Sequence, residues 1–232
     1  QTIRHRPRAA LPFTLQIGDP NIIAADTGLT VAGDFRRKDL ALGGQGAPLV
    51  PAFHAAMFRQ AGVARAVVNI GGIANLTVLP AEPSAPVLGF DTGPGNTLLD
   101  AWCRRHRGEP MDRDGQFAAR GRVREGLLAR LLADDYFARP APKSTGPEHF
   151  SLAWLEARAG GFVAEDVQAT LVALTAQSIA DAVLAGVGPG TAVFVCGGGA
   201  RNPLLMRELA ARLPAGAVQT TAALGVDPDW VE

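Results

Sequence analysis

The sequence has few charged residues and almost no lysine. Charged side chains make up 19% of the 232 residues, below the roughly 25% of an average soluble protein. The 22 basic side chains, of which only Lys38 and Lys143 are lysines, balance 22 acidic ones. A chain without net charge has no basic field that attracts nucleic acid or an anionic membrane. We therefore expect neither as a partner.

Cysteine is equally scarce, and long apolar runs are missing. Cys103 and Cys196 lie far apart and outside any CxxC or Cys/His pattern, which argues against a disulfide framework and a structural zinc site. No uninterrupted apolar run reaches the ~18 residues of a membrane span. We expect no signal peptide at the start of this sequence. These features predict reduced thiols in a cytoplasmic protein.

Glycine and proline, by contrast, are plentiful and fall in short clusters, with 27 and 17 residues. Three clusters follow a predicted strand and carry polar side chains: residues 69–75, 89–96 and 196–203. Glycine lets backbone N–H groups approach an anion, and a helix that follows adds its positive end. A single such cluster is more often only a turn. Three together favour a nucleotide or polyphosphate site, although none fits the P-loop or the GxGxxG pattern.

Apolar spacing predicts strands and helices in a mixed order. An antiparallel hairpin, residues 66–70 and 73–79, comes first in the larger part, and strand-loop-helix units follow. Further strands are expected over residues 11–17, 29–32, 87–90, 192–196 and 218–220. Helices are expected over residues 48–60, 97–107, 116–132, 150–158, 165–184 and 204–213. We predict an α/β fold of two lobes that divide near Gly62, with residues 1–62 in the first and 63–232 in the second.

Several motifs together resemble a known family. In chain order they are QTIRH (1–5), QIGDP (16–20), AGDFRRKD (32–39), GGQGAPLVP (43–51), NIGGIANLT (69–77), FDTGPGN (90–96), KSTG (143–146), CGGGARNP (196–203) and GVDPDW (225–230). With these motifs the chain resembles the anhydro-N-acetylmuramic acid kinases of the sugar kinase, Hsp70 and actin fold group. The resemblance implies a two-lobed actin-like ATPase fold, ribonuclease H-like. It also implies an incomplete N-terminal lobe, because about a third of the family's length should precede Gln1, and a final helix should follow Glu232.

The resemblance also implies a reaction. Water opens the 1,6-anhydro ring of N-acetylmuramic acid, and the freed 6-oxygen takes the γ-phosphoryl group of ATP, a step of peptidoglycan recycling. ATP and Mg²⁺ are the implied cofactors, a small amino sugar is the substrate, and a homodimer is the implied assembly. A carboxylate must activate the water. We predict Asp34 for this role, with Asp39 as the rival; an idle ion pair of Asp34 with a nearby arginine is the structural alternative.

The resemblance assigns further residues to the nucleotide and the sugar. Asp91 should orient Mg²⁺ through water; a purely structural alternative is that it caps the following helix. The other predicted nucleotide ligands are Asn69, Gly71, Gly72, Asn75, Thr92, Gly93, Gly95, Asn96, Gly197, Gly198 and Gly199. The predicted sugar contacts are Gln1, Thr2, Arg4, Gly18 and Asp19. Lys143 either contacts a phosphate or is an exposed loop lysine.

Two other functions stay open at this level. A non-catalytic, actin-like nucleotide-binding module would keep Asp91 and the glycine clusters but would not need Asp34. Another kinase of the fold group, acting on acetate or on an open-ring amino sugar, would need no water-activating base. Because the first phosphate loop of the family is expected before Gln1, we predict that these 232 residues alone bind ATP poorly and turn over little.

Overall fold

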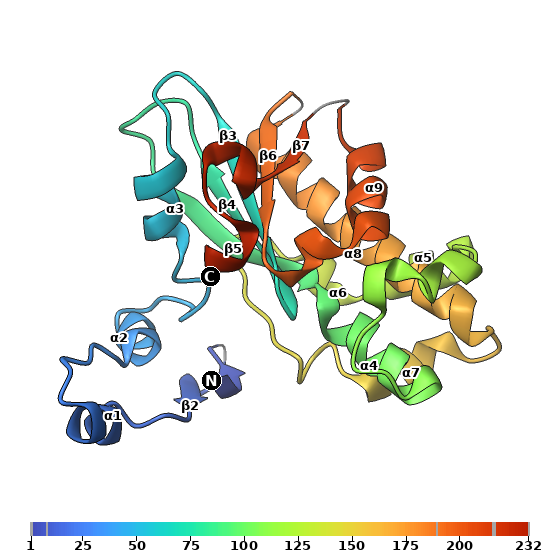
Figure 1. The fold of residues 1–232 in the computed structure, drawn as a ribbon, viewed down its shortest axis with the longest axis horizontal. Helices are drawn as coiled ribbons and strands as arrows, with labels where there is room; N and C mark the ends of the chain where they lie inside the picture. Colours follow the sequence, from blue (N-terminus) through green and yellow to red (C-terminus); the bar gives the residue numbers. More distant parts are fainter. Residues whose placement is uncertain (1, 8, 189, 215–216, 232) are drawn as a thin grey trace.

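A five-stranded sheet forms the centre of the computed structural model, which describes residues 2–7, 9–188, 190–214 and 217–231 (Figure 1). Its strands are β3 (Arg65–Ile70), β4 (Ile73–Leu79), β5 (Leu88–Pro94), β6 (Ala192–Cys196) and β7 (Val218–Thr220). They lie in the order β5-β4-β3-β6-β7. β4 is antiparallel to both neighbours, whereas β6 is parallel to β3 and β7 is parallel to β6. This is the ribonuclease H-like topology that the resemblance implies, and the α/β prediction is confirmed.

The predicted hairpin of β3 and β4 is confirmed, and both of its faces are covered. Every residue of β3 after Arg65 is buried, and so is every residue of β4 after Ile73. Strands that are buried on both faces read as continuous apolar runs without alternation. Ala66 and Val68 face the main core, whereas Val67 packs with Phe58 on the other side of the sheet.

The longest helix, α8 (Ala164–Val187), lies along the sheet and confirms the predicted helix over residues 165–184. It contacts β4 and β5 and also the helices α4 (Asn96–Arg107), α5 (Glu125–Leu132) and α9 (Pro203–Arg212). By length and composition α8 could cross a membrane, although polar residues interrupt its apolar run. Most of its residues are buried inside the protein. The apolar character of α8 is therefore that of a core helix.

The predicted helix over residues 116–132 is interrupted, and only its second half forms α5. Gly121 has an extended backbone, and a Cβ atom at this position would collide with the backbone of Glu165 at the start of α8. This close approach to α8 breaks the helix. Two further helices, α6 (Asp135–Ala138) and α7 (Leu152–Ala159), complete this side of the protein.

The first 60 residues form β1 (Thr2–Arg6), β2 (Phe13–Gln16), α1 (Pro20–Thr27), α2 (Phe35–Ala41) and α3 (Pro51–Phe58). Figure 1 shows β2, α1 and α2 grouped apart from the sheet, whereas α3 lies beside it. The predicted strand over residues 29–32 is wrong, because no strand in the described parts of the chain pairs with these residues. The helices α1 and α2 were not predicted; Asp19 caps α1, and Pro20 begins it.

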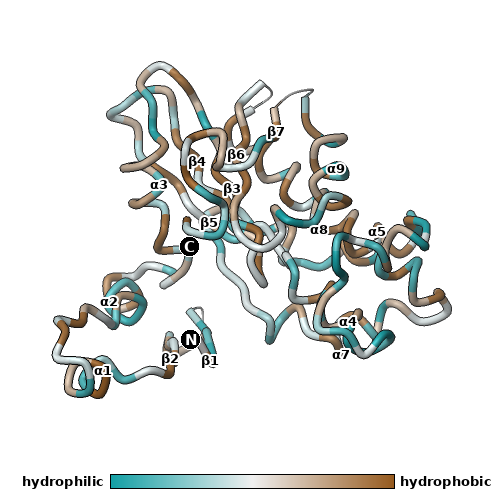
Figure 2. The backbone as a smooth tube through the Cα atoms, viewed as in Figure 1, coloured by the Kyte–Doolittle hydropathy of each residue, from teal (hydrophilic) through white to brown (hydrophobic). Residues whose placement is uncertain are grey.

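Large apolar side chains in this first segment are unusually exposed. Ile22, Leu29, Phe35 and Leu42 are each more than 60% exposed. Figure 2 shows the corresponding hydrophobic stretches along α1 and the loop that follows it. The main hydrophobic core, in contrast, begins at Ala66 and contains no residue of the first segment. The first segment therefore depends little on the main core.

Candidate functional site

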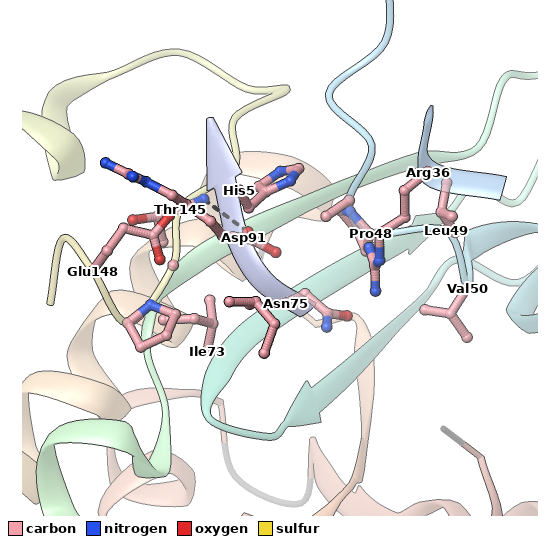
Figure 3. Close-up of a pocket in the computed structure, with 15 residues that line it drawn as sticks. His5, Arg36, Pro48, Leu49, Val50, Ile73, Asn75, Asp91, Thr145 and Glu148 are labelled. Atoms are coloured by element: carbon pink, nitrogen blue, oxygen red, sulfur yellow. Dashed lines mark hydrogen bonds between the residues drawn. The ribbon is translucent and has the colours of Figure 1, made fainter. Parts of the chain in front are cut away.

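A cavity of about 400 Å³ lies where the first segment faces the sheet (Figure 3). Asn75 on β4 and Asp91 on β5 line it from the sheet. Thr145 and Glu148 reach it from the loop between α6 and α7, and Arg36 comes from α2. In Figure 3, Arg36 lies on the opposite side of the view from Thr145 and Glu148. The cavity thus has charged groups of both signs at its walls.

Asp91 is only 5% exposed and is held at its backbone and at its carboxylate. Its Oδ2 atom accepts a hydrogen bond from the Thr145 N–H at 2.9 Å. Its backbone carbonyl accepts from the Tyr136 hydroxyl at 2.7 Å, and its own N–H donates to the Lys143 carbonyl at 2.9 Å. It does not cap α4, because the N-cap residue there is Gly95 and no side chain caps this end. The helix-capping alternative is therefore wrong.

Asn75 pairs with Asp91 across β4 and β5 and offers a second oxygen. Its Oδ1 atom is buried and has no hydrogen-bond partner among the described residues. Carboxylate and amide oxygens suit Mg²⁺, which usually keeps several water ligands. Within the described ranges, no group of three or more His, Cys, Asp or Glu side chains could hold a metal directly. These two residues therefore fit an ion that is bound through water.

The turn between β3 and β4 packs against the start of α4. The Gly71 carbonyl accepts from the Asn96 N–H at 2.8 Å, and the Gly72 carbonyl accepts from the N–H groups of Gly95 and Thr97 at 2.9 and 3.0 Å. A Cβ atom at Gly95 would collide with the Gly71 carbonyl. The structure therefore brings these predicted nucleotide ligands together. However, the first N–H groups of α4 donate to the turn, whereas the sequence favoured a phosphate as their partner.

Two other predicted nucleotide ligands, Thr92 and Gly93, continue β5 beyond Asp91. The Thr92 hydroxyl donates to the Ala74 carbonyl at 3.3 Å. A Cβ atom at Gly93 would meet the Phe137 ring, so this glycine permits close packing. Both residues therefore hold β5 in place, and neither lines a cavity among those found in the described parts.

The glycines after β6 divide into two roles. Side chains at Gly197 and Gly199 would collide with Asn69 and Ile70, so these glycines allow the loop to pack against the end of β3. A Cβ atom at Gly198 would meet only the Asn96 side chain, at an ordinary contact distance of 3.7 Å, and Gly198 lines a second cavity of about 600 Å³. Asn202 caps α9, because its Oδ1 accepts from the N–H groups of Leu204 and Leu205, both at 3.1 Å.

The second cavity has acidic walls that were not predicted. Asp100 on α4 and Asp112 line it together with Asn96 and Arg201. Burial raises the pKa of Asp100, and the charge of Asp112 adds to this rise while Arg104 opposes it. No local motif marks these residues, since they meet only through the fold. Carboxylates in such a cavity suit hydroxyl and amino donors.

Asp34 and Asp39 do not line the cavity at Asp91. Asp34 has a left-handed backbone and a half-exposed side chain, and its Oδ2 atom pairs with Arg37 at 3.1 Å. It lines a third cavity of about 860 Å³, together with Gly18 and Asp19. Asp39 accepts a hydrogen bond from the Gly46 N–H at 2.7 Å and so holds a turn. The ion pair considered for Asp34 is thus present.

The predicted sugar contacts divide between the two cavities of the first segment. Arg4 lines the cavity at Asp91, whereas Gly18 and Asp19 line the cavity at Asp34. Gln1 and the side chain of Thr2 lie outside the described residues. Arg36, which was not predicted, lines both cavities, and its NH1 atom donates to the Gly46 carbonyl at 2.7 Å. Its position inside the AGDFRRKD motif is the signal that could have found it.

His5 adds a buried, neutral group to the cavity at Asp91. Its Nδ1 atom lies 3.1 Å from the Thr14 hydroxyl, and its Nε2 atom has no hydrogen-bond partner among the described residues. Burial lowers the pKa of His5, and the nearby charge of Arg36 lowers it further. Since the ordinary value is 6.5, the imidazole is neutral at pH 7.

The side chain of Lys143 is buried, and a contact of Lys143 with a phosphate stays a prediction. It is 7% exposed, so it is not an exposed loop lysine, and it lines none of the cavities described above. Its Nζ atom donates to the carbonyls of Tyr136 and Phe137 at 3.0 and 3.1 Å. The same atom lies 4.7 Å from the centre of the Tyr136 ring. Burial lowers the pKa of this ammonium group.

Two solved structures are similar to this chain at low sequence identity. An activator of 2-hydroxyisocaproyl-CoA dehydratase from Clostridium difficile, solved with bound ADPNP, is 14% identical with a TM-score of 0.46 and matches 78% of this chain and 60% of its own. The xylulose kinase from Rhodospirillum rubrum is 17% identical with a TM-score of 0.46 and matches 78% of this chain and 40% of its own.

Sequence comparison is far more specific. Residues 1–232 match the family described as AnmK, anhydro-N-acetylmuramic acid kinase. The anhydro-N-acetylmuramic acid kinase of Shewanella baltica (strain OS185) is 56% identical over 235 residues, which cover 100% of this chain and 63% of the relative. That of Xanthomonas campestris pv. campestris (strain 8004) is 56% identical over 234 residues, with 100% and 62% covered. The chain thus spans less than two thirds of the length of these relatives. It belongs to the anhydro-N-acetylmuramic acid kinase family.

Proposed function

We propose that this protein is an ATP-dependent kinase that opens 1,6-anhydro-N-acetylmuramic acid with water and phosphorylates its 6-oxygen. Its relatives are named for a kinase of this sugar. The observation that supports the proposal best is the buried Asp91, held by three hydrogen bonds at the floor of a cavity that also holds Arg36 and Glu148. The product would be N-acetylmuramic acid 6-phosphate, and the process would be peptidoglycan recycling.

The two substrates would occupy different cavities. We place the sugar in the cavity at Asp91 and the nucleoside in the cavity lined by Gly198 and Asp100. The β3–β4 turn lies between them, since Ile73 lines the first cavity and Asn96, which donates to the Ile70 carbonyl, lines the second. The phosphates of ATP would follow this turn. Phosphoryl transfer depends mainly on such positioning.

Mg²⁺ would neutralise the phosphate charge when bound. The oxygens of Asp91 and Asn75 would hold it through water, in keeping with their hard donor atoms and their adjacent places on β5 and β4. The protein's own contribution is to keep both oxygens fixed beside the cavity.

The positions of Asp91, Asp34 and Asp39 favour another candidate for the water-activating base than the one predicted from the sequence. A base must lie within hydrogen-bond reach of the water that it activates. Asp91 lines the proposed sugar cavity, whereas Asp34 is paired with Arg37 beside another cavity and Asp39 holds the Gly46 N–H. We therefore propose Asp91 as the first candidate for the water-activating carboxylate. Asp34, followed by Asp39, is the alternative.

Arg36 would recognise the carboxylate that distinguishes a muramic acid from a glucosamine. Its guanidinium group is held by the Gly46 carbonyl and lines the cavity at Asp91. A planar guanidinium group binds a carboxylate through two parallel hydrogen bonds. The lactyl carboxylate of the sugar would then point toward α2, and the anhydro bond would lie closer to β5.

The reaction can be tested directly with the full-length protein. We expect ADP release and a 6-phosphorylated product from 1,6-anhydro-N-acetylmuramic acid, ATP and Mg²⁺, with oxygen from ¹⁸O-labelled water in the product when the mass is read promptly. Acetate and open-ring N-acetylmuramic acid serve as comparison substrates. Phosphorylation of either in preference to the anhydro sugar would favour another kinase of the fold group. ATP binding without turnover of any of them would favour a nucleotide-binding module.

Location and assembly complete the proposal. We place the enzyme in the cytoplasm, where ATP is available, and we propose a homodimer because the family resemblance implies one. Sedimentation of the full-length protein at micromolar concentration tests the assembly, and a monomer throughout the range would contradict it.

A further inference from the structure

The KSTG segment contains a buried lysine that the proposed sugar and nucleotide sites leave unused. We propose that Lys143 and Tyr136 are positioning residues that hold Asp91 in place for the reaction. This inference rests on the proposed function, since it gives Asp91 a task in it. The contacts that carry it form a closed ring of three residues.

Burial of the Lys143 ammonium group costs desolvation free energy. A buried cation is unfavourable unless its hydrogen bonds are satisfied. No ion pair with an acidic side chain compensates this one in the described parts of the chain. Its partners are instead the carbonyls of Tyr136 and Phe137, at 3.0 and 3.1 Å, and the face of the Tyr136 ring. The ammonium group therefore fixes the end of α6 to the KSTG segment.

Lys143 and Tyr136, the two residues that the ammonium group joins, both form hydrogen bonds with Asp91. The Lys143 carbonyl accepts from the Asp91 N–H at 2.9 Å, and the Tyr136 hydroxyl donates to the Asp91 carbonyl at 2.7 Å. Two residues after Lys143, the Thr145 N–H donates to the Asp91 carboxylate at 2.9 Å. Asp91, Lys143 and Tyr136 thus hold one another in a ring, and all three are at most 7% exposed.

The Tyr136 ring cannot shift easily to compensate for a loss. It is fully buried and packs edge-on against Phe150, with the ring centres 5.4 Å apart, and against Phe137 at 5.9 Å. Removing the ammonium group would leave the Phe137 carbonyl without this donor and the Tyr136 carbonyl with only the Arg139 N–H at 3.2 Å. The KSTG segment would then be free to move. The Asp91 carboxylate would then lose the fixed position that a reacting group needs.

The kinetic test uses the only two lysines of the chain. In the full-length protein, Lys143→Met should lower kcat for the anhydro sugar by about 10- to 100-fold, as expected for a misplaced reacting group. The KM for ATP should change little, because no residue of the KSTG segment lines the second cavity. The KM for the sugar should rise by less than kcat falls, because Thr145 lines the sugar cavity but Lys143 does not. Lys143→Arg, which retains a cation over the ring, should recover part of kcat. Lys38→Met is the matched control on the exposed side of α2 and should behave like the wild type.

A double-mutant cycle separates positioning from general structural support. If Lys143 acts through Asp91, Lys143→Met should cause no further loss of kcat in an Asp91→Asn background. Tyr136→Phe removes the single hydrogen bond from the hydroxyl to the Asp91 carbonyl. It should lower kcat by a smaller factor than Lys143→Met in the wild type, and it should cause no further loss in the Asp91→Asn background. This variant replaces Lys143→Met in the cycle if the lysine variant fails to fold. Equal losses in both backgrounds would overturn the inference.

A third measurement needs no substrate. Hydrogen exchange of the Thr145 amide should be slow in the wild type and in Lys38→Met, and about 10-fold faster in Lys143→Met, while the β3 amides stay protected. Unchanged exchange at Thr145 would overturn the inference, whatever the enzyme's substrate is. Failure of the wild type to phosphorylate the sugar would instead overturn the proposed function, and the exchange result would still decide whether Lys143 holds the segment.

Discussion

Asp91, Asp34 and Asp39 are carboxylates of one kind in three different surroundings. Asp91 is buried and accepts a backbone N–H, Asp34 forms a half-exposed ion pair, and Asp39 holds a turn. A catalytic carboxylate needs a fixed position and access to its substrate. At the scale of single residues, this difference in surroundings is the basis for choosing among them.

Replacing each carboxylate by its amide tests the choice. Asp91→Asn should lower kcat by about 10²- to 10⁴-fold, the usual range for loss of a general base. Asp34→Asn should leave kcat nearly unchanged and cost less than about 1 kcal/mol of stability, because its ion pair is exposed to solvent. Steady-state kinetics and urea unfolding of the full-length protein measure both effects. The reverse order of the two kcat values would return the role of base to Asp34.

Arg36 should determine which sugar is used. Arg36→Gln should lower kcat/KM for 1,6-anhydro-N-acetylmuramic acid by about 10- to 100-fold, since a charged hydrogen-bond partner is lost. The same variant should leave 1,6-anhydro-N-acetylglucosamine, which lacks the lactyl carboxylate, almost unaffected. Arg37→Gln is the control, because Arg37 is exposed and pairs with Asp34. A parallel loss for both sugars would show that Arg36 does not read the carboxylate.

At the scale of elements, α3 is joined to the sheet through a buried histidine. His54 is fully buried, and its Nδ1 atom lies 2.8 Å from the Thr77 hydroxyl on β4. Burial lowers the pKa of His54 from 6.5 to about 4. Between these two values the unfolded chain binds more protons than the folded protein. Acidification through this range therefore weakens the packing of α3.

The free energy of unfolding should consequently fall as the pH drops from 6.5 toward 4, by up to about 3 kcal/mol from His54. Above pH 6.5 and below pH 4 this residue adds no slope. Urea unfolding of the wild type and of His54→Gln at pH 7 and 4.5 isolates the contribution of His54 to the free energy of unfolding, because the other titrating groups are common to both proteins. Equal pH dependence in His54→Gln and wild type would contradict the assignment.

At the scale of the whole molecule, the two parts of the chain differ in how much they bury. The main core begins at Ala66, while the region before it exposes Leu29, Phe35 and Leu42. Local stability follows the density of buried contacts. The boundary near Gly62, which stays a prediction, should therefore separate a region that opens easily from one that does not.

Limited proteolysis tests this boundary. Trypsin should cut first in the exposed stretch, after Arg37 and Lys38, and a later cut after Arg59 should leave a resistant product that begins at Gln60, close to Gly62. Mass spectrometry of the early products identifies the cuts. A first cut inside α8, or equal cutting throughout the chain, would contradict the division.

Much of the fold could be predicted because its signals are local. The hairpin of β3 and β4 and the helix α8 are long apolar patterns, and such patterns suffice where an element is buried on most sides. The motifs from QTIRH to GVDPDW likewise placed the chain in its family, since their order is a property of the sequence alone. In both cases short stretches of consecutive residues were sufficient for the prediction.

What only the tertiary structure decided is which residues meet. Residues 29–32 lie beside no partner strand in the described parts of the chain, so this apolar run forms a loop. Gly121 packs against the start of α8, so the helix predicted there is interrupted. The tertiary structure also placed Asp34 and Asp91 in the linings of different cavities and buried Lys143 beside the Tyr136 ring. The physical reason is that burial and hydrogen-bond partners come from segments far apart in the chain, and no local pattern contains them.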